Sequence, residues 1–293
     1  MTFNDDVRID PGKVRRGGRR RGGIVAGGGL GVLALVLLSQ VLGVDLTGLG
    51  GDPGVQDGGT AAGESFDECR TGADANASVE CRMVGAADAI DTYWAAELPG
   101  LGGEYRTPEF VLFQQSVSTA CGGATSAVGP FYCPGDETIY IDTDFYGDLR
   151  SRFGASGGPL AEMYVVAHEW GHHIQNITGI MSGVDRRSTG PTSDAVRLEL
   201  QADCFAGAWA GEASTTPDPD TGVPFLEPIT RQQVADAMGA AAAVGDDRIQ
   251  STVSGDVQPH TWTHGSSEQR QQWFVTGYEQ GAGSCDTFAA SSL

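Results

Sequence analysis

The sequence has little positive charge. Its 293 residues include 18 Lys and Arg but 38 Asp and Glu, a net charge of −20. Seven of the basic residues lie within residues 1–21, beside three acidic ones, so the rest of the chain carries 11 basic and 35 acidic residues, a net charge of −24. Because such a surface repels a phosphate backbone, we expect no nucleic-acid partner.

The cysteine pattern lacks any C-x-x-C pair, which argues against zinc ribbons and thioredoxin chemistry. The 44 glycines also lack a Gly-X-Y period, which excludes collagen. Six cysteines without such pairs are typical of disulfides formed in an oxidising compartment. Several connectivities are open, and proximity in the sequence favours these candidates: Cys69 with Cys81, Cys121 with Cys133, and Cys204 with Cys285.

An uncharged stretch of 21 residues, 24–44, follows the basic start. A helix needs about 20 residues to cross a bilayer, and arginines before it favour a cytoplasmic N-terminus. We therefore predict a single-pass cell-membrane protein with a basic cytoplasmic segment (1–23), a transmembrane anchor (24–44), a flexible Gly-rich linker (45–64) and an extracytoplasmic domain (65–293). Two alternatives stay open for the apolar stretch: a cleavable signal peptide, although no clear A-x-A site follows it, and a buried core helix.

Helical periodicity dominates the chain after residue 65. We predict helices over residues 83–98, 160–177, 193–212, 230–245 and 267–281, and strands over residues 109–117 and 138–142. Capping-box starts are expected at Thr230 with Gln233 and at Ser266 with Gln269. The predicted fold class is α+β, mainly helical with a small sheet, preceded by one transmembrane helix.

Two of the five histidines lie in an H-E-x-x-H motif, His168-Glu169-Trp170-Gly171-His172. On a helix, positions i and i+4 share one face, so both imidazoles can reach one metal ion. The glutamate between them lies close enough to accept a proton from a metal-bound water. This is the arrangement of a zinc hydrolase.

Catalytic zinc needs a third protein ligand and an open position for water. The metzincin extension of the motif is absent, because Gln175 stands where its glycine would be. The next predicted helix carries Glu199 and Asp203 one turn apart, so one carboxylate can bind zinc while the other holds a ligand histidine. By itself, such a pair of acidic residues more often lies on a solvated helix face. Here it indicates a metal site because it follows the H-E-x-x-H motif.

Hydrolysis also needs a cationic or hydrogen-bonding group where the tetrahedral intermediate becomes negative. His264, at the start of a predicted helix, is the candidate, and the alternative is a plain loop residue. Arg270 is expected to lie near the site or to pair with an acid such as Glu199 or Asp203. His173 points about 100° away from its neighbour around the helix, so we expect it to be structural.

Four segments resemble the bacterial predicted neutral zinc metallopeptidase family, which consists of membrane-anchored, zincin-like proteins. They are CPGDETIYIDTDFYGDL, VVAHEWGHHIQNITGI, RLELQADCFAGAW and HGSSEQRQQWFVTGY, within about residues 66–285. The resemblance implies a zincin fold. It also implies that His168, His172 and Glu199 bind Zn²⁺, that Glu169 is the general base, and that Asp203 supports a ligand histidine.

We therefore expect a zinc-dependent endopeptidase of the cell envelope, with Glu169 taking a proton from a zinc-activated water. A peptide or protein substrate would add to the strand at 138–142, near Tyr140, by main-chain hydrogen bonds. The membrane is the second expected partner, through the N-terminal helix. Two alternatives stay open. One is a non-catalytic zincin-fold protein that binds a partner, and the other is a structural zinc site, which would favour Cys-rich ligation.

Overall fold

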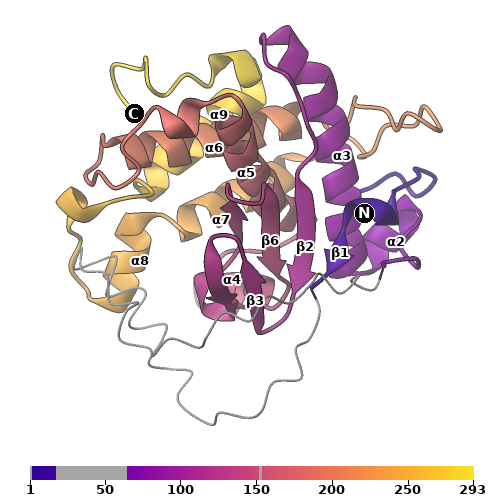
Figure 1. The fold of residues 1–293 in the computed structure, drawn as a ribbon, viewed down its shortest axis with the longest axis horizontal. Helices are drawn as coiled ribbons and strands as arrows, with labels where there is room; N and C mark the ends of the chain where they lie inside the picture. Colours follow the sequence, from indigo (N-terminus) through magenta and orange to yellow (C-terminus); the bar gives the residue numbers. More distant parts are fainter. Residues whose placement is uncertain (1, 18–64, 152–153) are drawn as a thin grey trace.

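The computed structural model describes residues 2–17, 65–151 and 154–293. They form a mixed α/β fold with small sheets (Figure 1). The helices are α2 (Gly72–Ala77), α3 (Val79–Gly100), α4 (Phe145–Ser151), α5 (Pro159–Ile177), α6 (Asp194–Glu212), α7 (Arg231–Ala243), α8 (Asp246–Val253) and α9 (Ser267–Gln280). The strands are β1 (Arg15–Arg16), β2 (Glu109–Phe113), β3 (Ser116–Thr119), β4 (Gly122–Thr125), β5 (Phe131–Cys133) and β6 (Thr138–Asp142).

The five predicted helices are present as α3, α5, α6, α7 and α9. Both predicted capping boxes form, since the side chains of Thr230 and Ser266 each accept a hydrogen bond from the backbone of the glutamine three residues later. The sequence did not reveal α2, α4 and α8, which have six, seven and eight residues. Helices of about two turns repeat their apolar positions too few times to give a periodic signal.

The larger sheet has the strand order β1-β2-β6-β5. β1, β2 and β6 are parallel, and β5 pairs antiparallel with β6. β6 therefore has hydrogen-bonded neighbours on both sides and cannot accept a substrate strand, which corrects the expectation for residues 138–142. The predicted strand 109–117 is also wrong as a single element, because the chain turns at Gln115 (φ 70°) and continues as the β3–β4 hairpin.

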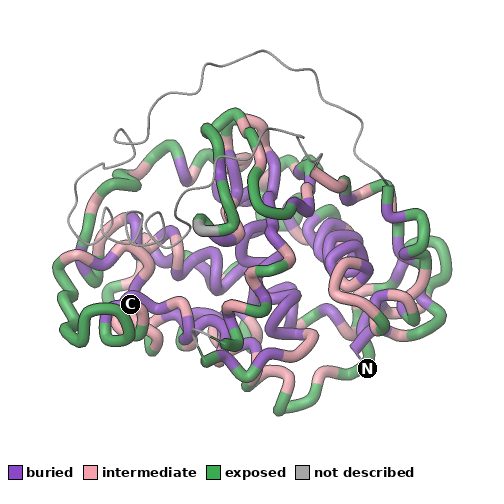
Figure 2. The backbone as a smooth tube through the Cα atoms, turned by 90° about the horizontal axis from the view of Figure 1, so that it is seen from below, coloured by how far each residue is buried: buried purple, intermediate pink, exposed green. Residues whose placement is uncertain are grey.

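The helices build the core around α6. α5 contacts both the sheet and α6, and α9 also packs against α6. Figure 2 shows buried residues concentrated in the middle of the molecule and exposed residues on the outer loops. α6 and α9 touch through their backbones: a Cβ atom added at Gly277 would lie 1.8 Å from the carbonyl oxygen of Cys204. Only glycine permits this approach.

Gly277→Ala is expected to lower the free energy of unfolding by about 2–3 kcal/mol, because the methyl group must push α9 away from α6. Urea denaturation measures the change. Gly239→Ala is the matched control, since Gly239 lies inside α7 and its added Cβ would meet only the Ser156 Oγ at 3.7 Å. That control should stabilise by roughly 0.5–1 kcal/mol through helix propensity. Equal stability of the two variants would contradict the backbone contact.

All three predicted disulfides are present: Cys69–Cys81, Cys121–Cys133 and Cys204–Cys285. The first two close short loops with a sequence separation of 12, and the third spans 81 residues. The third joins α6 to the end of the chain beyond α9. It therefore constrains the unfolded chain most and holds α6 against the C-terminal residues.

Residues 2–17 pack against the region from residue 65 onwards, which corrects the predicted membrane topology. Phe3, Val7, Ile9 and Val14 are at most 5% exposed, and β1 extends the sheet beside β2. A cytoplasmic N-terminus and an extracytoplasmic domain cannot share one packed core, so the predicted localisation is wrong.

The transmembrane helix in the predicted fold class is likewise not supported. No helix in the described parts of the chain is long and apolar enough to cross a bilayer. The stretch predicted as an anchor, 24–44, and the linker, 45–64, lie outside the described residues. The supported fold is therefore a mixed α/β domain that includes residues 2–17, and a membrane partner is not supported.

Candidate metal centre

The H-E-x-x-H motif lies in the second half of α5. The helix starts with Pro159 at its first position, where a missing N–H costs nothing. Nearly all of its residues are buried, because it lies between the sheet and α6. His168 and His172 are one turn apart and face α6. Their rings lie 4.8 Å apart, centre to centre.

Glu199 of α6 completes a cluster with these two histidines. Its carboxylate oxygens lie 3.3 Å from the Nε2 atom of His168 and 3.5 Å from the Nε2 atom of His172. One donor atom from each of the three residues lies within 4.8 Å of the others. Among the described residues, this is the one group of three or more His, Cys, Asp or Glu side chains with that geometry. Two imidazoles and one carboxylate form the His₂Glu donor set of catalytic zinc sites, so the residues fit the ion.

Asp203 fixes the orientation of His168. Its Oδ1 lies 2.9 Å from the Nδ1 atom of His168 and accepts a 2.5 Å hydrogen bond from the Tyr164 hydroxyl. Arg270 donates to both oxygens of the carboxylate, at 2.8 and 3.0 Å. Burial raises the pKa of Asp203, but Arg270 and His168 outweigh it and hold the pKa below its usual value. An ionised Asp203 accepts a hydrogen bond from the Nδ1–H of His168, which keeps Nε2 as the ring nitrogen directed at Glu199 and available to an ion.

Gln175 fixes the orientation of His172, a role that the sequence analysis missed. Its side-chain amide donates to the Leu198 carbonyl at 2.7 Å and to the Gln201 Oε1 at 3.1 Å. Its oxygen is therefore an acceptor, and the Nδ1 atom of His172 donates to it at 2.9 Å. The sequence offered one sign, namely that Gln175 occupies the position where a metzincin has glycine.

Glu169 lies beside the cluster and is only 7% exposed. Burial raises its pKa above the usual value, although His168 and His172 act in the opposite direction. A carboxylate with a raised pKa is a better proton acceptor than one in water.

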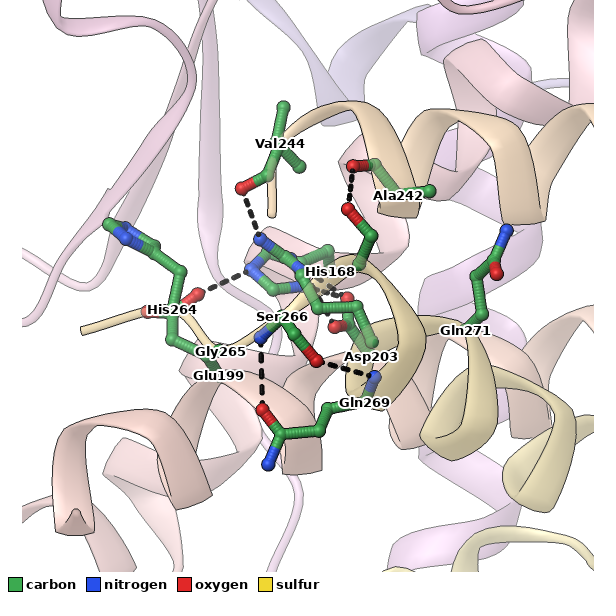
Figure 3. Close-up of polar contacts among 12 residues, drawn as sticks. His168, Glu199, Asp203, Ala242, Val244, His264, Gly265, Ser266, Gln269 and Gln271 are labelled. Atoms are coloured by element: carbon green, nitrogen blue, oxygen red, sulfur yellow. Dashed lines mark hydrogen bonds and ion pairs between the residues drawn. The ribbon is translucent and has the colours of Figure 1, made fainter. Parts of the chain in front are cut away.

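His264 interacts electrostatically with Glu199, which Figure 3 draws with it, and its orientation is fixed by Asp246. The backbone N–H groups of Thr263, His264 and Gly265 donate to one oxygen of Asp246, at 2.8, 2.7 and 3.0 Å. The other oxygen lies 3.3 Å from the Nδ1 atom of His264. Burial lowers the pKa of His264, but Glu199 and Asp246 outweigh it and raise the pKa above the usual value. Asp246 was not singled out in the sequence analysis, because it belongs to no motif and begins α8, a helix that the sequence did not reveal.

Comparison with known proteins agrees with this site. The family model described as "Putative neutral zinc metallopeptidase" matches residues 3–288. The chain belongs to this family. Its relatives include the uncharacterized protein Rv2575 of Mycobacterium tuberculosis, 52% identical over 234 residues, which are 80% of this chain and 78% of the relative. The uncharacterized protein YpfJ of Escherichia coli is 37% identical over 295 residues, which are 98% of this chain and 96% of the relative. No solved structure matches the chain.

The family match covers every candidate residue of the metal centre and also residues 3–17. The structure separates the remaining candidates by position. Arg270 pairs with Asp203, one of the two acids considered. His173 is fully buried on another face of α5, where its ring nitrogens lie 3.1 Å from the Tyr132 hydroxyl and 2.7 Å from the Arg106 carbonyl. It takes no part in the cluster, in line with a structural role.

Proposed function

We propose that this metallopeptidase-family protein is a zinc-dependent endopeptidase. The observation that supports this most strongly is the buried Glu169 between two clustered ligand histidines. A structural zinc site needs no such base, and its ligands are usually closed and rich in cysteine. All six cysteines here are in disulfides.

His168, His172 and Glu199 are proposed to hold the ion, with Asp203 and Gln175 fixing the two imidazoles. When bound, zinc supplies Lewis acidity, which makes a water more acidic and polarises a peptide carbonyl. Glu169 is proposed to take the proton of the attacking water and to deliver it to the leaving amine. Its partial desolvation supports the first step, because a raised pKa makes the carboxylate a stronger proton acceptor.

His264 is proposed to stabilise the negative oxygen that develops during attack. Asp246 supports this role by holding both the backbone and the ring of His264. The same carboxylate favours the protonated imidazole, which is the form that can donate from both ring nitrogens.

An extended peptide is the proposed substrate. In the described sheet, β5 is the edge strand on the side of β6, and the Tyr132 hydroxyl of β5 accepts a 2.9 Å hydrogen bond from Asn176 of α5. An edge strand next to the metal helix can pair with a substrate backbone, which an interior strand such as β6 cannot. We therefore place the substrate along β5.

The test is cleavage of a mixed peptide library by the full-length protein loaded with zinc, read by mass spectrometry. We expect internal cleavage that stops when a chelator removes the metal and returns when zinc is added. Circular dichroism of the chelated sample is the control for unfolding. Protein that binds zinc yet cleaves no peptide would contradict the proposal and favour the non-catalytic, partner-binding alternative.

A further inference from the structure

Residues 2–17, called here the N-terminal strap, pack against the region from residue 65 onwards through specific backbone contacts. The side-chain oxygen of Asn76 accepts from the backbone N–H groups of Thr2 and Phe3 at 3.0 and 3.1 Å, and its amide donates to the Phe3 carbonyl at 2.9 Å. A Cβ atom added at Gly72 would lie 1.8 Å from the carbonyl oxygen of Asn4. Specific backbone contacts of this kind hold the strap in one register.

Near its C-terminal end, the strap forms a largely buried ion pair with α3. The ammonium group of Lys13 lies 3.2 Å from Asp88 and in direct contact with Asp91. Burial works to lower the pKa of Lys13, but the two carboxylates outweigh it and raise the pKa. The Lys13 side chain is 23% exposed, and those of Asp88 and Asp91 are 12% and 10% exposed, so the pair is poorly screened by solvent.

Hydrogen bonds continue from this pair to the metal helix. The Tyr105 hydroxyl donates to Asp91 at 2.5 Å, and the indole N–H of Trp170 donates to the Tyr105 hydroxyl at 3.1 Å. Trp170 lies inside the H-E-x-x-H motif, directly after Glu169. Lys13 is thus linked to the motif through two intervening side chains.

A second hydrogen bond connects α5 to the segment that contains Tyr105. The Arg106 carbonyl, next to Tyr105, accepts the 2.7 Å hydrogen bond of His173. Trp170 and His173 lie on either side of the ligand His172 in the sequence. Residues 105–106 therefore contact α5 on the side that faces away from the metal centre. They do so at the helical turn that carries the ligands.

We propose that the N-terminal strap is a positioning element of the metal centre, which acts through Lys13, Asp91 and Tyr105 on Trp170. With the strap in place, the turn containing Glu169 and His172 is held in the geometry that binds zinc and performs hydrolysis. Lys13 is a positioning residue and touches no reacting atom. The family match, which begins at residue 3, includes the strap. The turnover part of this inference rests on the proposed peptidase function, whereas the zinc-binding part does not.

The test compares Lys13→Met, Tyr105→Phe and the double variant in the full-length chain. Zinc affinity is measured by competition with a chelator, and kcat and KM are measured on a cleaved peptide at 25 °C. Arg15→Met is the matched control, because Arg15 belongs to the same strap but its ion pair with Glu109 is exposed, with side chains 61% and 53% accessible. Lys13→Gln, which keeps a hydrogen-bond donor without the charge, replaces Lys13→Met if that variant does not fold.

We expect each single variant to lower zinc affinity and kcat by about three- to tenfold with KM unchanged. The double variant should be no worse than the poorer single one, because both changes break one connection. Arg15→Met should behave as the wild type. Two results would overturn the inference: a lower melting temperature with unchanged zinc affinity and kcat, or losses that multiply in the double variant. If wild-type protein cleaves no peptide, the peptidase proposal fails. The zinc affinities of the variants then test the positioning role of the strap by themselves.

Discussion

Replacing Glu169 by glutamine is expected to lower kcat by about 10²–10⁴-fold while leaving the fold and the zinc content unchanged. Glutamine has nearly the same shape but cannot take the proton of the attacking water or pass it to the leaving amine. Glu169 is not one of the three clustered donors, so the residues that bind the ion are untouched. Steady-state cleavage of a peptide found in the library measures the change.

Zinc content per chain and the melting temperature are the controls for Glu169→Gln. Both should match the wild type, since the substitution removes a charge that burial already disfavours. A variant that keeps wild-type turnover would contradict the assignment of Glu169 as the base. A variant that loses its zinc would show instead that Glu169 supports the ion.

Asp203→Asn is expected to lower the free energy of unfolding by about 3 kcal/mol and zinc affinity by about 10–100-fold. The stability loss comes from Arg270, which is 2% exposed and would be left as a buried charge without its partner. The loss of zinc affinity comes from His168, whose Nδ1–H would lose an ionised acceptor. Urea denaturation and chelator competition measure the two effects separately.

The double variant Asp203→Asn with Arg270→Met is the control for this network. It should be more stable than Asp203→Asn alone, because no unpaired charge remains buried. Its zinc affinity should stay low, since the acceptor of His168 is still not ionised. If Asp203→Asn binds zinc as tightly as the wild type, Asp203 does not act through His168.

The central part of the site could be predicted because it lies on two long periodic helices. His168 and His172 are one turn apart within α5, and Glu199 and Asp203 are one turn apart within α6, so local geometry already places each pair on one face. That the two pairs meet followed from motif order. Arg270 was expected to lie near the site or to pair with an acid such as Glu199 or Asp203. In the structure it pairs with Asp203.

Contacts between residues distant in the sequence could not be predicted in this way. Asp246 and Gln175 matter because of what they face. Asp246 belongs to no motif, and Gln175 was visible only as the residue that replaces the metzincin glycine. The place of β6 inside the sheet depends on β5, a strand of three residues that gives no alternating pattern. The membrane topology failed for a similar reason: it weighed charge and hydropathy locally, whereas the strap contacts residues up to 231 positions away.

The charges around the metal centre have a consequence for the ion itself. Asp203 is neutralised by Arg270, and protonated His264 by Asp246. The carboxylates of Glu169 and Glu199 therefore remain as the uncompensated charges of a largely buried site. Imidazoles that bind an ion are neutral and add nothing to this sum. A divalent cation therefore brings the centre to neutrality, whereas a monovalent or trivalent one leaves a net charge out of contact with water, at a cost of several kcal/mol. This charge balance would favour a divalent ion over ions of other valence, in addition to the preference set by the donor atoms.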